Sequence, residues 1–255
     1  MPLKTLTPLA GQTALVTGAS RGLGRAMAIG LAETGAKVAL VARNPEPLKN
    51  VVAEIEAAGG SAFAFPADVT SEASVNELQR AVSAQLGTVS ILVNNAGMNL
   101  RKSLVEFTLA EWELVLRTNL TSAFIVCHAF VPQMRGHGYG RIINLTSMLA
   151  HIALPLRTAY CASKAGLLGM TKALALELAE EGITVNAISP GPFATEMNLP
   201  ILNNPAANAD FLAKIPVKKW GRPEDLGALA VYLCSPAAAY VTGTDFVIDG
   251  GWTAQ

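Results

Sequence analysis

The sequence predicts a single-domain α/β fold, a doubly wound parallel sheet of about seven strands with helices on both faces. Short, continuous apolar runs alternate with amphipathic stretches, and such runs are typical of parallel strands covered on both sides. The alternation continues across residues 1–255 without a linker or an internal repeat, which favours right-handed crossovers within one domain. With 255 residues, 51% of them hydrophobic and 15% charged, the chain can bury a large core.

The individual elements follow from these runs. The apolar runs predict strands over 13–17, 37–42, 61–66, 90–94, 140–145, 184–189 and 245–248. The amphipathic stretches predict helices over 23–34, 45–58, 71–85, 108–134, 158–181 and 223–234. Residues 193–220, where prolines and asparagines gather, interrupt the alternation. We expect them to form a mobile, lid-like insertion, with an ordinary long surface loop as the alternative.

Composition argues against several classes of protein. Lysine plus arginine (19) balances aspartate plus glutamate (19), so the zero net charge argues against a nucleic-acid-binding protein. We expect no apolar stretch of the roughly 20 residues that a membrane span needs, and no signal peptide. Three scattered cysteines, without metal-ligand spacing to the histidines, predict a cytoplasmic protein with no disulfide framework and no metal site.

A glycine-rich turn follows the first predicted strand and leads into the first predicted helix. It reads Gly18-Ala19-Ser20-Arg21-Gly22-Leu23-Gly24. Glycine lets the backbone turn sharply and approach a pyrophosphate, while the helix N-terminus offers free N–H donors. This placement predicts a Rossmann-type dinucleotide site; the alternative is a tight turn without a ligand.

Residues at the end of the second predicted strand indicate which dinucleotide binds. An acidic side chain there would hold a ribose 2′-hydroxyl, whereas an arginine favours a 2′-phosphate. The window contains Arg43 and Asn44 and no carboxylate, and Arg21 in the glycine turn can assist. We therefore expect NADP(H) to be preferred. The alternative is that Arg43 is a solvated loop residue and NAD(H) serves as well.

Further short motifs follow along the chain. They are Asp68-Val69, Asn94-Asn95-Ala96-Gly97, Asn119, Ser147, Tyr160-Cys161-Ala162-Ser163-Lys164 and Pro190-Gly191. Together with the glycine turn, and in this order, they resemble the short-chain dehydrogenase/reductase family over almost the whole chain. The resemblance implies three further groups of cofactor residues, namely Asp68 and Val69 at the adenine, Asn95, Ala96 and Gly97 along the cofactor, and Pro190, Gly191, Phe193 and Thr195 beside the nicotinamide amide.

Tyr160 and Lys164 are the centre of the predicted chemistry. They are four residues apart in a predicted helix and therefore lie on one face. Because an ammonium group favours a phenolate, we expect Lys164 to lower the pKa of Tyr160 from its ordinary value near 10. The family resemblance adds three roles: Ser147 polarises the substrate oxygen, Asn119 holds a helix kink and a water linked to Lys164, and Lys164 bonds the nicotinamide ribose.

These residues predict an NADP(H)-dependent oxidoreductase that interconverts a ketone and a secondary alcohol by hydride transfer, with Tyr160 as acid and base. The candidate substrate residues are Ser147, His151, Arg101 and Phe193. Segments around Ser147 and Arg101 resemble gluconate 5-dehydrogenase members of the family, so a keto sugar acid is the expected substrate. The glycine turn resembles 3-oxoacyl-acyl-carrier-protein reductases equally well, and an acyl carrier protein would then be a partner. A dinucleotide-binding sensor without catalysis is the remaining alternative.

The family resemblance also implies an assembly. Related enzymes are homotetramers built through two long helices, here 108–134 and 158–181, and through the C-terminal strand and helix. Ala165, Leu168, Ala173 and Leu176 form an apolar stripe on the second helix that suits such an interface but could equally face the sheet.

Overall fold

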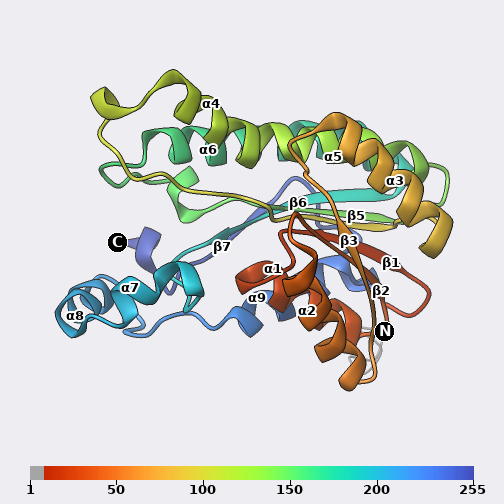
Figure 1. Ribbon diagram of the computed structural model, residues 1–255, viewed down its shortest axis with the longest axis horizontal. Helices are drawn as coiled ribbons and strands as arrows, with labels where there is room; N and C mark the ends of the chain where they lie inside the picture. The colour runs from red at the N-terminus through yellow and green to blue at the C-terminus, as the bar shows by residue number, and fades with distance from the viewer. Residues whose placement is uncertain (1–8) are drawn as a thin grey trace.

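Residues 9–255 are described by the structure, a computed structural model, and they form one seven-stranded parallel sheet in the order β3-β2-β1-β4-β5-β6-β7 (Figure 1). The strands are β1 Thr13–Thr17, β2 Lys37–Ala42, β3 Ser61–Pro66, β4 Ile91–Asn94, β5 Gly140–Leu145, β6 Ile183–Pro190 and β7 Asp245–Ile248. The predicted fold class is confirmed, and the predicted strands differ only by one residue at an end of β4 and at each end of β6.

The sheet reverses its direction of growth beside β1. This strand pairs with β2 on one side and β4 on the other, so that Leu15 lies between Ala39 and Leu92. Strands β2 and β3 extend the sheet one way, and β4 to β7 extend it the other way. In doubly wound sheets the ligand binds at the carboxyl ends of the strands next to this reversal. The predicted glycine turn and residues 94–97 both lie at that position.

Helices cover both faces of the sheet. One layer consists of α1 Gly22–Glu33, α2 Pro45–Ala57 and α9 Pro223–Cys234, and the other of α3 Glu72–Leu86, α4 Leu109–Leu116, α5 Ser122–Met134 and α6 Thr158–Leu178 (Figure 1). Alternate strand residues feed two separate cores: Val16 and Leu40 belong to the first, and Leu15 and Val41 to the second. Because both faces are covered, the strands are largely apolar.

The predicted helix 108–134 contains one irregular turn. After α4, residues Arg117–Thr121 form a single π-helical turn before α5 begins. The whole rod Leu109–Met134 is 26 residues long and, by length and composition alone, apolar enough to cross a membrane. The expectation that no stretch reaches this length was therefore wrong. Half of its most apolar window is buried within the protein, as in a helix that covers a sheet.

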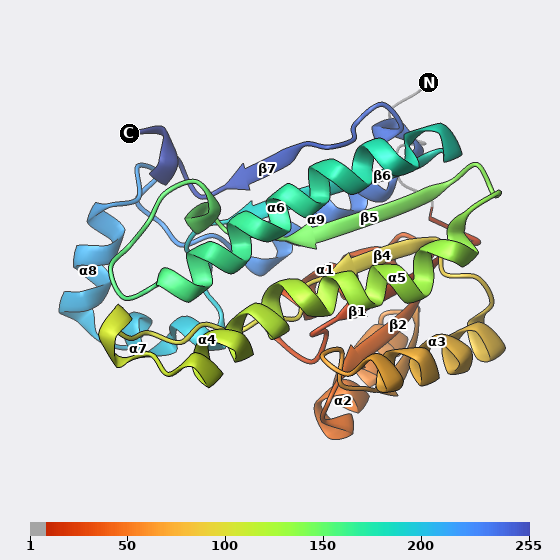
Figure 2. The ribbon, with the colours of Figure 1, turned by 90° about the horizontal axis from the view of Figure 1, so that it is seen from above.

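The 193–220 segment is more regular than expected. It contains two short helices, α7 Leu199–Leu202 and α8 Pro205–Ala213. Asn204 caps α8 by accepting a hydrogen bond from the Ala207 backbone N–H (3.1 Å), and Pro205 occupies the first helical position. The asparagine and proline that suggested a loop therefore mark the start of a helix. Figure 2 shows both helices beyond the carboxyl ends of the strands, near the C-terminus.

Candidate active site

The glycine turn is pressed against the segment that follows β4. The Thr17 hydroxyl accepts hydrogen bonds from the backbone N–H groups of Asn95 (2.9 Å) and Ala96 (3.0 Å). The Asn95 amide in turn donates to the carbonyls of Thr17 (2.9 Å) and Gly18 (3.1 Å). A Cβ atom on Gly24 would lie 2.4 Å from both the Asn95 amide nitrogen and the Gly18 carbonyl oxygen. Only glycine fits there, so the turn keeps its backbone close to the sheet edge.

The N-terminus of α1 faces the start of the 193–220 segment. Gly22, its first residue, has a left-handed φ of +56°, and the first turn of α1 contains no acidic residue. A Cβ atom on Gly22 would lie 3.6 Å from Glu196 Oε2 and 3.8 Å from Thr195 Cγ2. The structure thus brings Thr195 to the glycine turn. Phe193, in contrast, is 3% exposed and packs on Gly221.

The ends of β2 and β3 bring Arg43 close to Asp68. Asp68 accepts hydrogen bonds from the backbone N–H (2.9 Å) and the hydroxyl (2.8 Å) of Thr70. These bonds, with the positive charges of Arg43 and Arg117, hold the pKa of Asp68 below its usual range. Arg43 and Asn44 are exposed, and Asn44 caps α2 through the Glu46 backbone N–H (3.2 Å). A positive charge and an ionised carboxylate therefore stand at this end of the cleft.

Asn119 is buried in the π-helical turn and joins three segments. Its side-chain oxygen accepts the Met98 backbone N–H (2.7 Å), and its amide donates to the Met98 carbonyl (2.9 Å) and to Ser163 Oγ (2.9 Å). A Cβ atom on Gly97 would lie 3.3 Å from Asn119 Oδ1 and 3.5 Å from Lys164 Nζ. Asn119 thus connects the loop after β4 to α6, beside the Lys164 amine.

Lys164 is 4% exposed, an unusual position for a lysine. Its Nζ donates a hydrogen bond to the Leu145 carbonyl at the end of β5 (2.5 Å) and lies 5.7 Å from the centre of the Tyr160 ring. Burial lowers the pKa of Lys164 from 10.5 to about 8, because desolvation disfavours its charged form. The amine therefore changes its protonation state around pH 8.

Tyr160 departs from expectation. Burial raises its pKa above 10.0, and the nearby Ser147 hydroxyl, which favours the phenolate, only partly offsets this effect. The expected lowering of the pKa by Lys164 was wrong for the protein without a ligand. Helical spacing places an amine near the phenol, but it does not reveal that the amine is buried and the phenol half-buried.

Ser147 begins a single 3₁₀ turn, Met148–Ala150, directly after β5. It is 7% exposed, and its Oγ accepts the Leu149 backbone N–H (3.1 Å). His151 ends this turn, but its Nε2 lies 2.5 Å from the Asp245 carboxylate, so this nitrogen is not free for a substrate as expected. Sequence reasoning missed Asp245 as a site residue, although a carboxylate at the head of an apolar strand signals a buried partner.

Two arginines lie near the start of α6, and one of them is close to Tyr160. Arg157 immediately precedes α6, and burial, the positive charge of Arg101 and its own closeness to Tyr160 all act on its pKa, with a net lowering. The preceding Leu156 has a φ of +65°, a strained left-handed conformation for a bulky side chain. The backbone is thus strained at Leu156, directly before the arginine that lies near the Tyr160 phenol.

The end of β6 contacts the C-terminal tail. A Cβ atom on Gly191 would lie 2.4 Å from the Asp249 Cβ, and the Gly191 N–H donates to the Ile248 carbonyl (2.9 Å). The Asp249 carboxylate accepts the backbone N–H groups of Gly251 and Thr253, both at 2.8 Å. Pro190 and Gly191 therefore lie at the same sheet edge as Ser147, with the tail folded against them.

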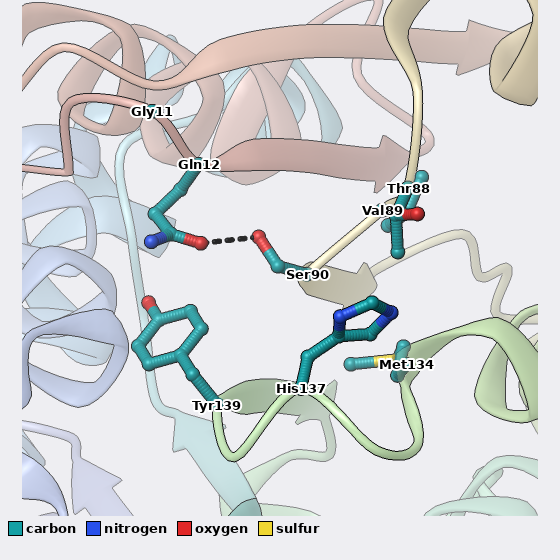
Figure 3. A pocket seen from close by; sticks show the side chains of 8 residues that line it. All are labelled: Gly11, Gln12, Thr88, Val89, Ser90, Met134, His137 and Tyr139. Atoms are coloured by element: carbon teal, nitrogen blue, oxygen red, sulfur yellow. Dashed lines mark hydrogen bonds between the residues drawn. The ribbon is translucent and has the colours of Figure 1, made fainter.

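A hollow at the amino ends of the strands, opposite to this site, does not belong to it. It is lined by Gly11, Gln12, Thr88, Val89, Ser90, Met134, His137 and Tyr139 (Figure 3). These residues precede β1, β4 and β5, so they stand at the amino ends of the strands and include none of the expected site residues. Within residues 9–255, no group of three or more histidine, cysteine, aspartate or glutamate side chains could hold a metal ion.

Known proteins resemble the chain along its whole length. A protein-family model described as enoyl-(acyl carrier protein) reductase matches residues 18–253. The 3-oxoacyl-[acyl-carrier-protein] reductase of Synechocystis sp. is 41% identical over 248 residues, 96% of this chain and 98% of that protein. The gluconate 5-dehydrogenase of Gluconobacter oxydans is 36% identical over 250 residues, 98% of each chain. A crystal structure of gluconate 5-dehydrogenase from Burkholderia cenocepacia in complex with NADP and tartrate has a TM-score of 0.93 at 33% identity, covering 98% of this chain and 99% of that chain.

Proposed function

The chain belongs to the short-chain dehydrogenase/reductase family of oxidoreductases, and from this premise we propose that it interconverts a ketone and a secondary alcohol with NADP(H). One observation carries the proposal. Ser147 lies close enough to Tyr160 for its hydroxyl to act on the pKa of the phenol, beside a buried Lys164, at the carboxyl ends of the strands where the glycine turn also lies. An acid–base phenol, a polarising hydroxyl and a dinucleotide turn are the groups that hydride transfer to a carbonyl requires.

The glycine turn fits a dinucleotide. Gly24 has no room for a Cβ atom, which keeps the turn close to Asn95. The first turn of α1 itself contains no acidic residue, and the carboxylate near Gly22 is that of Glu196, from the 193–220 segment. Gly18, Gly22 and Gly24 would hold the pyrophosphate. The cofactor is expected to be NADP(H), because Arg43 at the end of β2 can pair with a 2′-phosphate and the Burkholderia relative is in complex with NADP. NAD(H) is the second cofactor, since Arg43 is exposed and not fixed in place.

The proposed mechanism uses Ser147 and Tyr160 as a pair. When bound, the nicotinamide supplies the hydride for reduction and accepts it in oxidation. Ser147 and Tyr160 hold the substrate oxygen between their hydroxyls; Ser147 polarises it and Tyr160 transfers the proton. The raised pKa of Tyr160 keeps the phenol protonated at neutral pH, which is the form that protonates a ketone oxygen. Lys164 holds a second exchangeable proton beside it, and Asn119 fixes the backbone around that amine.

The proposed substrate is a keto sugar acid. Arg101 and Arg157 are close enough for the charge of one to lower the pKa of the other, and within residues 9–255 neither forms an ion pair. Two unpaired like charges near the start of α6 are unfavourable unless an anion lies between them. A substrate carboxylate would supply that anion, and relatives of this chain include gluconate 5-dehydrogenases.

A second candidate function has its own support. Lys214, Lys218 and Lys219 in the 193–220 segment and Arg222 just after it are all exposed, and such a basic patch suits the acidic surface of an acyl carrier protein. Reduction of 3-oxoacyl groups is the activity named for the Synechocystis relative. The carbonyl chemistry at Ser147 and Tyr160 would be the same, so only the substrate distinguishes the two proposals.

A substrate comparison tests the proposal. NADPH oxidation is followed with 5-ketogluconate and with an acetoacetyl thioester, and NADH replaces NADPH in a second series. We expect a higher kcat/KM for 5-ketogluconate with NADPH. A higher value for the thioester would favour the acyl-carrier reductase. Stabilisation by NADPH without turnover of either ketone would indicate the sensor and contradict the proposed reaction.

We further propose a homotetramer in the cytoplasm. Large apolar side chains are exposed on the outer helices: Leu109 (72%) and Leu114 (48%) on α4, Phe124 (56%) on α5 and Leu176 (81%) on α6. Leu168, in contrast, is buried, so the predicted apolar stripe on α6 is only partly exposed. The three cysteines form no disulfide, which suits a reducing compartment. Light scattering would report the number of subunits.

A further inference from the structure

A buried carboxylate lies behind the catalytic serine. Asp245, the first residue of β7, has a side chain that is 8% exposed, and its Oδ2 is bonded by His151 Nε2 (2.5 Å) and Ser189 Oγ (2.7 Å). An ionised carboxylate is an acceptor only, so the serine hydroxyl donates to it and the histidine carries its proton on Nε2. The Asp245 carboxylate thus connects β6, β7 and the loop after β5, which are distant in sequence.

These contacts hold both ends of the short segment that carries Ser147. On its N-terminal side, Thr146 Oγ1 donates to the Ile188 carbonyl (2.8 Å) and lies 2.7 Å from Ser189 Oγ. On its C-terminal side, His151 closes the 3₁₀ turn through its backbone N–H to the Met148 carbonyl (3.0 Å) and is held by Asp245 through its ring. Ser147 lies between these two attachments, in a turn that contains only three residues.

The position of the Ser147 hydroxyl depends on this turn. Ser147 Oγ accepts the Leu149 backbone N–H (3.1 Å), which fixes the side chain as a cap and leaves its own proton for another acceptor. If the His151 end of the turn moved, the Leu149 N–H and the oxygen that it orients would move too. Catalytic groups lose rate when they are displaced by fractions of an ångström, whereas cofactor binding elsewhere is unaffected.

We propose that Asp245 and His151 are positioning residues for the reduction step, which hold the Ser147 hydroxyl where it polarises the substrate oxygen. This inference rests on the proposed function, because it assigns Ser147 that role. It replaces the expectation that His151 binds the substrate, because its Nε2 is bonded to Asp245. Its consequence is a loss confined to kcat when the contact is broken.

Variants at both positions test the inference. His151→Leu removes the donor, His151→Gln keeps an N–H that can reach Asp245, and Asp245→Asn removes the charge. We expect His151→Leu and Asp245→Asn to lower kcat by about tenfold or more, with the KM values for ketone and NADPH within about twofold of wild type. His151→Gln should recover a large part of kcat. Because both single variants break one contact, the double variant should be no slower than either alone.

His137→Leu is the matched control, since His137 is exposed near the amino ends of the strands (Figure 3). A rise in the ketone KM at unchanged kcat would make His151 a substrate contact and overturn the inference. A lower melting temperature with unchanged kcat, or a His151→Gln variant as slow as His151→Leu, would also overturn it. Wild-type protein that turns over no ketone would instead defeat the proposed function, so the two failures are distinguishable.

Discussion

The buried amine of Lys164 predicts a measurable dependence of folding stability on pH. In the unfolded chain the lysine has a pKa of 10.5, whereas in the folded protein burial lowers the pKa to about 8. Between these values the unfolded chain binds a proton that the folded protein does not, so the free energy of unfolding rises with pH in this window. Lys164 should add about 2 kcal/mol of stability between pH 7.0 and pH 9.5, worked from the two pKa values.

The assay is urea denaturation of the cofactor-free protein at both pH values, compared with Lys164→Met. The methionine keeps the length of the side chain and cannot titrate. Subtracting its stability from that of wild type removes the contributions of other titrating groups, and the difference should grow by about 2 kcal/mol toward high pH. Lys172→Met, exposed on the same helix α6, is the matched control. A wild-type minus variant difference that is equal at both pH values, or falls at pH 9.5, would refute the argument from burial.

Three further predictions concern binding. Arg43→Asp should raise the KM for NADPH by about tenfold or more and spare NADH, because a carboxylate repels the 2′-phosphate; an unchanged cofactor ratio in steady-state kinetics would remove Arg43 from this role. Arg157→Leu should raise the KM for 5-ketogluconate by about tenfold to a hundredfold, the worth of one charged hydrogen bond, with little effect on a neutral ketone; an equal effect on both ketones would contradict carboxylate binding. Gly24→Ala should destabilise the fold by about 1–3 kcal/mol and weaken NADPH binding, because its Cβ would lie 2.4 Å from backbone; thermal melts with and without NADPH check both effects, and a wild-type response would show that the turn has room.

Much of the fold could be predicted because buried parallel strands are apolar on both faces. Leu15 and Val16 in β1 and residues 91–93 in β4 are all buried, and a continuous apolar run is the pattern that such burial produces. The 193–220 segment was harder to predict, because Asn204 and Pro205 are favoured both in loops and at the start of a helix. Composition does not distinguish these two uses, and the packing around α8 decides between them.

The candidate site could also be predicted only in part from the sequence. Spacing along one helix could place Tyr160 beside Lys164, since four residues make about one helical turn. It could not predict the pKa of Tyr160, because burial depends on elements that are distant in sequence. His151 and Asp245 are 94 residues apart and meet only because β7 pairs with β6. A contact of that kind requires the strand order, which periodicity does not contain.

Substitution of the phenol tests the central claim, that Tyr160 is the acid and base for hydride transfer. Steady-state turnover of 5-ketogluconate and the dissociation constant of NADPH are measured for Tyr160→Phe, with Tyr232→Phe on the outer surface of α9 as the control. The phenylalanine keeps the ring and removes only the hydroxyl. We predict that kcat falls by about a hundredfold or more while NADPH binds as tightly as to wild type. A Tyr160→Phe enzyme that retains wild-type kcat would contradict the claim.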